Sequence, residues 1–539
     1  MPAKNDDAMH LLHRVIVLRR QAWLLQGHPF FQEIAAVPRR INRALKTLSV
    51  LALTLAISGC IGTAGIAPQG KALEANSLAT DQAIQSAAQD AHWPAAQWWQ
   101  AYGDPQLNRW IDLAVQGSPT IAMAAARVRQ ARSMAGIAQS AESLQVNGES
   151  TLKRHNWPTD QFYGPGDLAN TTTWDNNAAL GFSYALDLWG RESNATERAV
   201  DLAHMSAAEA RLAQLELQNN VVRAYIELSL HYAQRDIVAA TLKQQQQILD
   251  LAQKRLDGGI GTHFEVSQAE TPLPETHRQI DALDEEIALS RNQLAALAGK
   301  GPGEGAQLQR PTLSLGAALK LPSSLPAQLL GQRPDVVASR WQVAAQARGI
   351  DVAHAGFYPN VDLVGSLGYM ATGGGALEFL TGQKLNYSVG PAISLPIFDG
   401  GRLRSELGEA SAGYDIAVAR YNQTLVNALK NISDQLIRRE SMDKQQSFAA
   451  ESVATAQKTY DIAMIAYQRG LTDYLNVLNA QTLLFKQQQV QQQVQAARLS
   501  AHAELVTALG GGLGAGNDVP KDSQTTAPKT PAILTSLSN

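Results

Sequence analysis

The sequence predicts a mainly α-helical protein with a small membrane-type β part, built from two copies of one half. Three observations lead to this fold class: a duplicated residue pattern, very long tracts free of glycine and proline, and short segments in which apolar and polar residues alternate. A charged fraction of 17% and a net charge of −3 provide no basic surface for nucleic acid. We therefore expect no nucleic-acid partner.

The two halves of the chain repeat each other at an offset of 211 residues. Gly259-Ile260 recurs as Gly470-Leu471, and Val266 recurs as Val477 (470 − 259 = 477 − 266 = 211). This period is far longer than that of solenoid repeats, so it indicates a duplicated half-protein.

The N-terminal region has the pattern of an export signal. Basic residues precede an apolar stretch, Leu48–Ile57, and Ser58-Gly59-Cys60 follows. Residues 57–60 resemble the bacterial lipobox, in which the cysteine is lipidated; an ordinary signal peptide with an incidental cysteine is the alternative. Cys60 is the one cysteine, so no internal disulfide is expected. The predicted domains are a signal peptide (1–59), a lipidated tether (60–91), a first repeat (92–310), a second repeat (311–512) and a disordered tail (513–539).

Three tracts without glycine or proline predict helices far longer than the usual three or four turns. They are Arg191–Leu256, Tyr414–Arg469 and Leu471–Leu509. At about 1.5 Å per residue, the first would be about 100 Å long if unbroken. Apolar and small residues recur every three or four positions, as in a coiled coil. The Gln-rich opposite faces fit either a solvated surface or the wall of a water-filled lumen.

Glycine-containing turns interrupt these tracts and predict two helical hairpins. Their tips fall at about residues 258–262 and 469–473. In the downstream arm of the first hairpin, Pro272 and Pro274 predict a kink or a looser helix.

Segments with period-two alternation predict four strands, at about residues 143–154, 174–188, 360–370 and 386–398. One apolar face and one small or polar face fit a membrane β-barrel with lipid outside and water inside. A half-buried sheet in a water-soluble domain is the alternative. Four strands cannot close a barrel, and lipid does not tolerate an open sheet edge. If the strands span a membrane, several copies must therefore join.

Several motifs resemble those of the outer-membrane factors, the TolC/OprM-like family, and within it the NodT-type efflux lipoproteins. These motifs, in order between residues 92 and 512, are Trp98-Trp99, Leu186-Asp187-Leu188-Trp189-Gly190-Arg191, Arg333-Pro334-Asp335, Phe357-Tyr358-Pro359 and Ala466-Tyr467-Gln468-Arg469-Gly470-Leu471-Thr472. The resemblance implies a TolC-like protomer of duplicated helix–β-hairpin–helix units. Four strands from each chain of a homotrimer would form a 12-stranded outer-membrane barrel, continuous with a long periplasmic α-barrel.

The resemblance also implies a function. Such proteins are passive, gated exit ducts of tripartite efflux systems in the outer membrane of Gram-negative bacteria. The implied partners are a periplasmic membrane-fusion adaptor protein, an inner-membrane efflux pump and outer-membrane lipid, and no cofactor is implied. The pump selects the transported compound, and the similarity is greatest to ducts for fusaric acid and other aromatic acids or drugs.

By the same resemblance, the hairpin tips would bind the adaptor. The tip residues are Arg255, Gly259, Ile260, Gly261 and Thr262 in the first repeat, and Arg469, Gly470, Leu471, Thr472 and Asp473 in the second. Glycine permits the turn, and an exposed Ile or Leu offers an apolar anchor. Packing within the hairpin is the alternative for Ile260 and Leu471.

A periplasmic gate would lie just beyond the second tip, on Leu475, Asn476 and Asn479. Relatives often carry Asp where the two Asn residues stand. Because a ring of carboxylates attracts cations and a ring of amides does not, we expect a closed gate that is less cation-selective than theirs.

The sequence favours neither of two other classes of protein, an enzyme and a periplasmic scaffold. The sequence has no recognisable catalytic motif or metal cluster, so we do not expect the protein to be an enzyme. The acid–base pairs Asp187/Arg191 and Asp399/Arg402 are interpreted as ion pairs or helix caps. A lipid-anchored periplasmic coiled-coil scaffold would share the long helices, but it does not need alternating strands.

Overall fold

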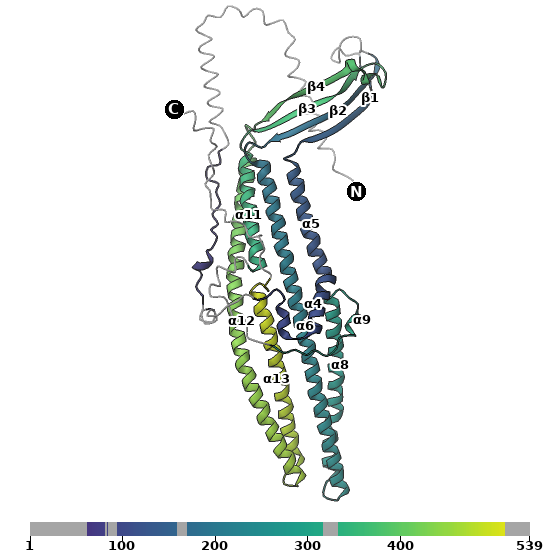
Figure 1. Cartoon of the computed structure of the whole chain (residues 1–539), viewed down its shortest axis with the longest axis vertical. Helices are drawn as coiled ribbons and strands as arrows, with labels where there is room; N and C mark the ends of the chain where they lie inside the picture. The colour runs from purple at the N-terminus through teal and green to yellow at the C-terminus, as the bar shows by residue number, and fades with distance from the viewer. Residues whose placement is uncertain (1–61, 81–83, 85–93, 159–169, 316–331, 513–539) are drawn as a thin grey trace, which may run out of the picture. The chain divides into compact units, whose positions relative to one another are not determined.

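The computed structural model describes residues 62–80, 84, 94–158, 170–315 and 332–512 (Figure 1). Cys60, the predicted signal peptide and the predicted tail lie outside the described residues. The elements in the first half are α4 (Pro105–Gly117), α5 (Pro119–Ser140), β1 (Gln145–Asn156), β2 (Thr172–Leu186), α6 (Arg191–Asp257), α7 (His263–Glu270), α8 (Pro272–Leu297) and α9 (Pro302–Gly305). Those in the second half are α11 (Pro334–Ala355), β3 (Asn360–Thr372), β4 (Leu385–Ser394), α12 (Arg402–Gln468) and α13 (Tyr474–Ala508).

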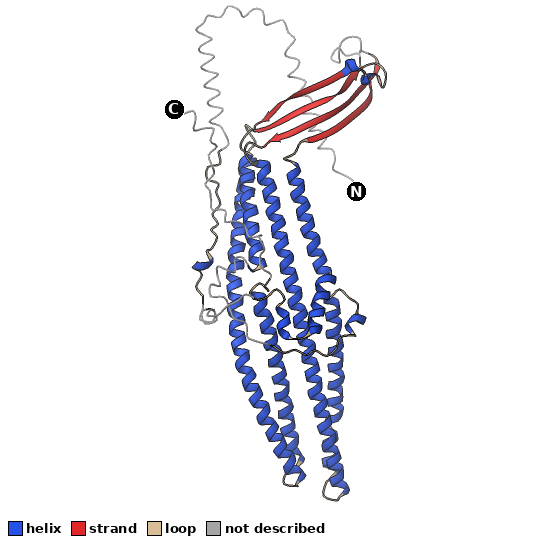
Figure 2. Ribbon diagram, in the orientation of Figure 1, coloured by secondary structure: helices blue, strands red, loops and turns tan. Residues whose placement is uncertain are grey.

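The strands form one antiparallel sheet in the order β1-β2-β3-β4 (Figure 2). Its register places Leu180 opposite Leu367, and Leu367 opposite Tyr387. Within the described residues, β1 and β4 are the two edges of this sheet. The alternation predicted a fourth strand as far as residue 398, but β4 ends at Ser394. Pro396, which has no backbone N–H to donate, follows soon after.

Two long hairpins carry most of the helical residues. One pairs α6 with α7 and α8, and the other pairs α12 with α13 (Figure 1). The predicted interruption at Pro272 is present as a break, because α7 ends at Glu270 and Pro272 begins α8. Further along the two hairpins, α11 packs against both α6 and α12, and α5 packs against α6. The resulting order of neighbours is α5, α6, α11 and α12.

The largest hydrophobic core joins α4, α6, α8 and α13 to the segment that carries Trp98 and Trp99. Buried polar contacts fix the same region. The Tyr225 hydroxyl donates to Asp104 Oδ2 (2.8 Å), and the Tyr102 hydroxyl donates to the carbonyl of Leu499 (2.8 Å). Arg333 Nη1 donates to the carbonyl of Ala508 (2.6 Å), so the Arg-Pro-Asp motif fastens the end of α13 to the start of α11. These motif residues therefore have structural roles.

No helix within the described ranges is both long and apolar enough over 18 residues to cross a membrane.

Candidate functional sites at the hairpin tips, the constriction and the sheet

The first hairpin tip is the turn from Gly258 to Thr262, between α6 and α7. Gly259 has a φ of +75°, a conformation that favours glycine. The N–H groups of Ile260 and Gly261 both donate to the carbonyl of Arg255 (3.0 and 2.9 Å). A Cβ on Gly261 would lie 2.7 Å from the backbone nitrogen of Leu256, so this position accepts only glycine without a shift of the backbone.

The second tip is built in the same way. Gly470 has a φ of +72°, and the N–H of Leu471 donates to the carbonyl of Ala466 (2.8 Å). Asp473 then caps α13 by accepting from the N–H of Asn476 (3.2 Å). In the first tip, Thr262 caps α7 through a reciprocal pair of 3.1 Å bonds with Glu265. The two cap residues are 211 positions apart (473 − 262), so the repeat extends to the helix caps.

Both tips expose the apolar residues that the sequence singled out. Ile260 is 71% exposed and Leu471 is 76% exposed, so the alternative in which they pack within the hairpin is wrong for this chain. Sequence reasoning missed Phe264, which is 74% exposed in the first turn of α7. The repeat was the available signal, because Phe264 corresponds to Leu475 (475 − 264 = 211). Each tip therefore carries two exposed apolar side chains, four residues apart.

Arg255 lies between the hairpins and does not project from the tip as expected. It is half-buried, and its guanidinium carbon is 5.1 Å from the centre of the Tyr467 ring. The rings of Tyr467 and Tyr474 lie 6.1 Å apart in a core that contains residues of both hairpins. Burial, together with the neighbouring Tyr467 and Tyr460, raises the pKa of Tyr474 to about 12. Arg255 thus helps to hold the two hairpins together.

The predicted gate residues lie on the exposed side of the first turns of α13. Leu475, Asn476 and Asn479 are exposed, whereas Tyr474 and Val477 are buried against the other hairpin. The amide nitrogen of Asn476 donates to Thr472 Oγ1 (2.8 Å) and to Asp473 Oδ1 (3.1 Å). The amide of Asn476 is therefore engaged in the helix cap.

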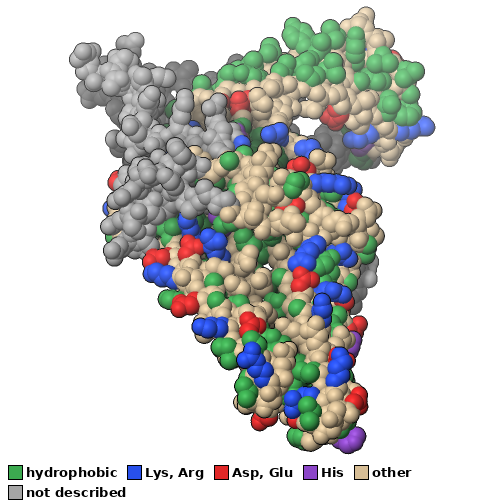
Figure 3. Space-filling view, turned by 60° about the horizontal axis from the view of Figure 1, so that its bottom comes forward, with side chains coloured by type: hydrophobic (Ala, Val, Ile, Leu, Met, Phe, Trp, Pro, Cys, Tyr) green, Lys and Arg blue, Asp and Glu red, His purple; other side chains and the backbone are tan. Residues whose placement is uncertain are grey.

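The two faces of the sheet carry different kinds of side chain, as the rows of cross-strand neighbours show. In cross-strand register, one face carries Leu180, Phe182, Tyr184 and Leu186 on β2, Val361, Leu363, Gly365 and Leu367 on β3, and Tyr387, Val389, Pro391 and Ile393 on β4. The opposite face carries Ala179, Gly181, Ser183 and Ala185, then Asp362, Val364, Ser366 and Gly368, and finally Asn386, Ser388, Gly390 and Ala392. Figure 3 shows hydrophobic side chains gathered over the sheet and charged side chains gathered over the helices.

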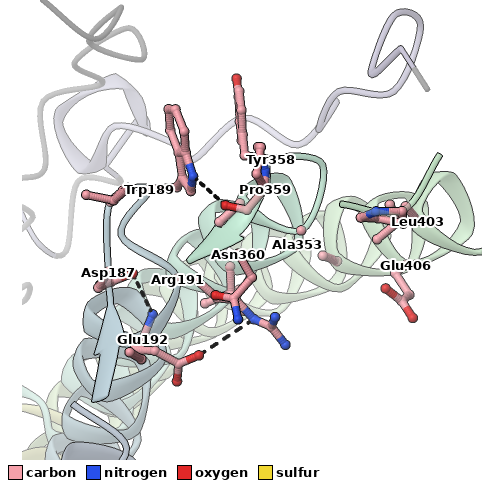
Figure 4. A pocket seen from close by; sticks show the side chains of 18 of the residues that line it. Asp187, Trp189, Arg191, Glu192, Ala353, Tyr358, Pro359, Asn360, Leu403 and Glu406 are labelled. Atoms are coloured by element: carbon pink, nitrogen blue, oxygen red, sulfur yellow. Dashed lines mark hydrogen bonds and ion pairs between the residues drawn. The ribbon is translucent and has the colours of Figure 1, made fainter. Parts of the chain in front are cut away.

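A cavity of about 810 Å³ lies at the corners where strands meet helices (Figure 4). Asp187, on its wall, accepts from the N–H groups of Glu192 (3.2 Å) and Ser193 (2.9 Å) in the first turn of α6. At the other corner, Arg402 pairs with Glu406 (2.6 Å). The interpretation of Asp187 as a helix cap is confirmed. Within the described part of the chain, no group of three or more His, Cys, Asp or Glu side chains could hold a metal ion.

The model of the outer membrane efflux protein family matches this chain at residues 110–300 and 325–511. The fusaric acid resistance protein FusA of Burkholderia cepacia is 47% identical over 478 residues, which cover 88% of this chain and 89% of FusA. The multidrug resistance outer membrane protein MdtP of Escherichia coli K12 is 29% identical over 495 residues, which cover 89% of this chain and all of MdtP.

Solved structures agree with these relatives. The outer membrane protein VceC of Vibrio cholerae aligns with a TM-score of 0.73 and 33% identity, over 78% of this chain and all of VceC. The outer-membrane channel OprN aligns with a TM-score of 0.74 and 25% identity, over 82% of this chain and 99% of OprN. The predicted fold class is therefore confirmed as that of TolC-like channels, whose family is one of efflux ducts and not of enzymes. This chain belongs to the outer membrane efflux protein family.

Proposed function

We propose that the protein is the exit duct of a tripartite efflux system, and that it passively conducts small toxic compounds from a periplasmic adaptor and an inner-membrane pump to the outside. The observation that carries the proposal is the sheet. On β2, β3 and β4 one face is apolar from the row of Leu180 to the row of Leu186, while the other is small or polar apart from Val364. Such a sheet fits lipid on one side and water on the other.

The open edges of the sheet support a homotrimer. β1 and β4 leave backbone groups without a strand partner within the described residues, and such an edge is not tolerated in lipid. Joining β4 of one copy to β1 of the next satisfies both edges, and three copies would give a closed 12-stranded barrel. The strands are 10 to 15 residues long, enough for a tilted membrane strand of about 9–11 residues.

Aromatic residues at both ends of the sheet support a transmembrane position. At one end, Trp157 Nε1 donates to Thr173 Oγ1 (2.8 Å). At the other end, Trp189 stacks on Tyr358 with 4.7 Å between ring centres, and its Nε1 donates to the carbonyl of Pro359 (2.8 Å). Membrane barrels carry such aromatic girdles at the two levels where lipid meets water.

The remaining assignments belong to the same proposal. The tips, with Ile260 and Leu471 as anchors, bind the periplasmic adaptor; Leu475, Asn476 and Asn479 form the gate; and Cys60 carries a lipid in the outer membrane. The name of FusA, a fusaric acid resistance protein, favours aromatic acids or drugs as cargo. The matched segments, 110–300 and 325–511, support the division into two repeats.

The proposal is tested with the full-length protein purified from outer membranes. We expect a trimer that migrates as a monomer only after heating, strand signal in circular dichroism, and stepwise single-channel currents in planar bilayers. Deleting the gene should lower resistance to the cargo without accumulation of a modified product. A monomer without channel currents would support the lipid-anchored scaffold.

A further inference from the structure

An N-terminal segment, Thr63–Leu78, follows the first part of α12, and we call it the strap. Arg404 Nη2 donates to the carbonyl of Ala64 (3.2 Å), and 18 residues further along α12 the Asn422 side chain accepts from the N–H of Leu73 (2.8 Å). On the helix, 18 residues rise about 27 Å. The nine residue-to-residue steps from Ala64 to Leu73 reach about 30 Å when fully extended. After a turn at Thr63–Ile66, the strap therefore follows α12 with little slack between its two fastenings.

The strap is held by its backbone. Asp415 Oδ1 accepts from the N–H groups of Gln69 (2.8 Å) and Gly70 (2.6 Å), and Asn422 Nδ2 donates to the carbonyl of Lys71 (2.9 Å). Asp415 and Asn422 are seven residues apart, so they share a face of α12. A Cβ on Gly70 would lie 3.0 Å from Asp415 Oδ1, so glycine allows this close approach.

At its far end the strap enters a small core. Ala75 is 4% exposed and belongs to a cluster with Val336 of α11 and with Tyr421, Leu425 and Ala428 of α12. The path along α12 is thus fixed at both ends and in the middle.

Because the backbone is used for docking, the strap presents its side chains outward. The exposed side chains include the apolar Ala64, Ala67, Pro68, Ala72 and Leu73, together with the polar Gln69, Lys71 and Glu74. Beside the strap, α12 exposes two further apolar side chains, Ile416 (54%) and Val426 (42%). An exposed apolar surface of this kind marks an interaction site.

The order of the strands and helices along the sequence indicates what covers this surface. β1 follows α5 directly, and β4 leads into α12. If β4 of one copy pairs with β1 of the next, α12 must lie beside the next copy's α5. α5 buries none of its residues in this chain, and it exposes Met123 (56%), Met134 (56%) and Ile137 (71%).

We propose that the strap is part of the interface between copies, and that its exposed apolar side chains, with Ile416 and Val426 of α12, receive α5 of the next copy. The inference rests on the proposed trimer. It gives the segment after Cys60 a role in assembly, in addition to linking the lipid to the barrel.

Site-specific photo-crosslinking of the full-length protein in outer membranes tests the inference. A benzophenone side chain at Ala67 or Leu73 should form crosslinks between chains that map to α5. The same probe at Glu209, exposed on the central helix α6, is the matched control and should give none. Crosslinks from Leu73 that remain within one chain, in a preparation where trimers are present, would overturn the inference.

A second measurement concerns the strength of the interface. The double variant Asp415→Ala/Asn422→Ala should lower the temperature at which the trimer dissociates in detergent by about 5 °C, whereas Glu209→Ala, exposed on α6, should leave it unchanged. An unchanged dissociation temperature of the double variant would contradict the strap's role. Absence of any trimer in the wild type would refute the proposed function itself.

Discussion

At the proposed gate, the side chains of Asn476 and Asn479 would determine the charge that a permeating ion meets. Asn479 is exposed on α13, whereas the amide of Asn476 is bonded to Thr472 and Asp473 in the helix cap. A carboxylate at residue 476 would sit beside Asp473 and weaken that cap by repulsion. Residue 479 is therefore the better position at which to change the charge of the ring.

Asn479→Asp should raise the permeability of cations relative to anions, because three copies would form an anionic ring. The measurement is the reversal potential of single channels in a KCl gradient, with Asn427→Asp on the exposed surface of α12 as the control. An unchanged reversal potential would show that residue 479 does not line the constriction.

A buried carboxylate on α6 gives the fold a pH dependence. Asp201 is 7% exposed, and its burial raises its pKa to about 6, with Arg348 opposing and Glu197 adding to the shift. The native state therefore disfavours the ionised form. Stability from this group is fully present below the ordinary pKa near 3.8 and is lost as the pH rises through about 6.

Asp201→Asn should accordingly raise the melting temperature at pH 7.5 and have little effect near pH 4. Thermal unfolding followed by circular dichroism at the two pH values is the measurement, and Glu209→Gln, exposed on the same helix, is the control. An equal effect of Asp201→Asn at both pH values would contradict the raised pKa.

Among the elements, the sheet offers the sharpest test of which face meets lipid. Leu367 and Ser366 are neighbours on β3 with opposite faces, and Ser366 Oγ lies 2.8 Å from Ser388 Oγ on the polar face. Leu367→Arg should destabilise the folded barrel by about 2–4 kcal/mol, the range for arginine at the bilayer midplane. Ser366→Arg should cost far less, because water would solvate it. Reversible unfolding in lipid vesicles gives both values, and a larger cost for Ser366→Arg would reverse the assignment of the faces.

The hairpin tips carry apolar side chains that are largely exposed in this chain. Because Ile260 and Leu471 are more than 70% exposed, Ile260→Ser and Leu471→Ser should leave the thermal stability of the protein unchanged. Each should weaken binding of the adaptor at least about tenfold, as expected when an apolar anchor is removed. Calorimetric titration with the adaptor measures the effect. Loss of stability without loss of binding would mean that these residues serve the fold.

Local patterns in the sequence predicted much of this architecture. The long helices could be read because glycine and proline are absent from them, and the strands because their alternation matches the two faces of the sheet. Alternation also continued through Leu395, which is not in a strand, since period-two spacing carries no information about pairing. In α12, Gly408 and Gly413 lie inside the helix. The glycine-free tract therefore predicted a helix from Tyr414, whereas α12 begins at Arg402.

Contacts between distant parts of the chain were not predictable. The cation–π contact of Arg255 with Tyr467 joins the two hairpins, and the sequence around Arg255 contains no pattern that predicts it. The strap is the extreme case, since Gly70 and Asp415 are 345 residues apart and the strap has no periodicity of its own. Such contacts arise from tertiary packing, which one sequence does not display.

For the molecule as a whole, the sheet and the helices share one order of neighbours. β1 to β4 lie side by side in sequence order, and the helices joined to them, α5, α6, α11 and α12, do the same. An edge strand is therefore attached to an edge helix at each end of the row. One association between copies would satisfy the strand edges and cover the exposed helices together, so we expect assembly and channel formation to be a single event.

Electron cryomicroscopy of the full-length protein extracted from outer membranes would show the assembly itself. We expect three copies around one axis, with β4 of each hydrogen-bonded to β1 of the next and the row from Leu180 to Leu186 facing detergent. A monomer that buries this row against its own chain would contradict it.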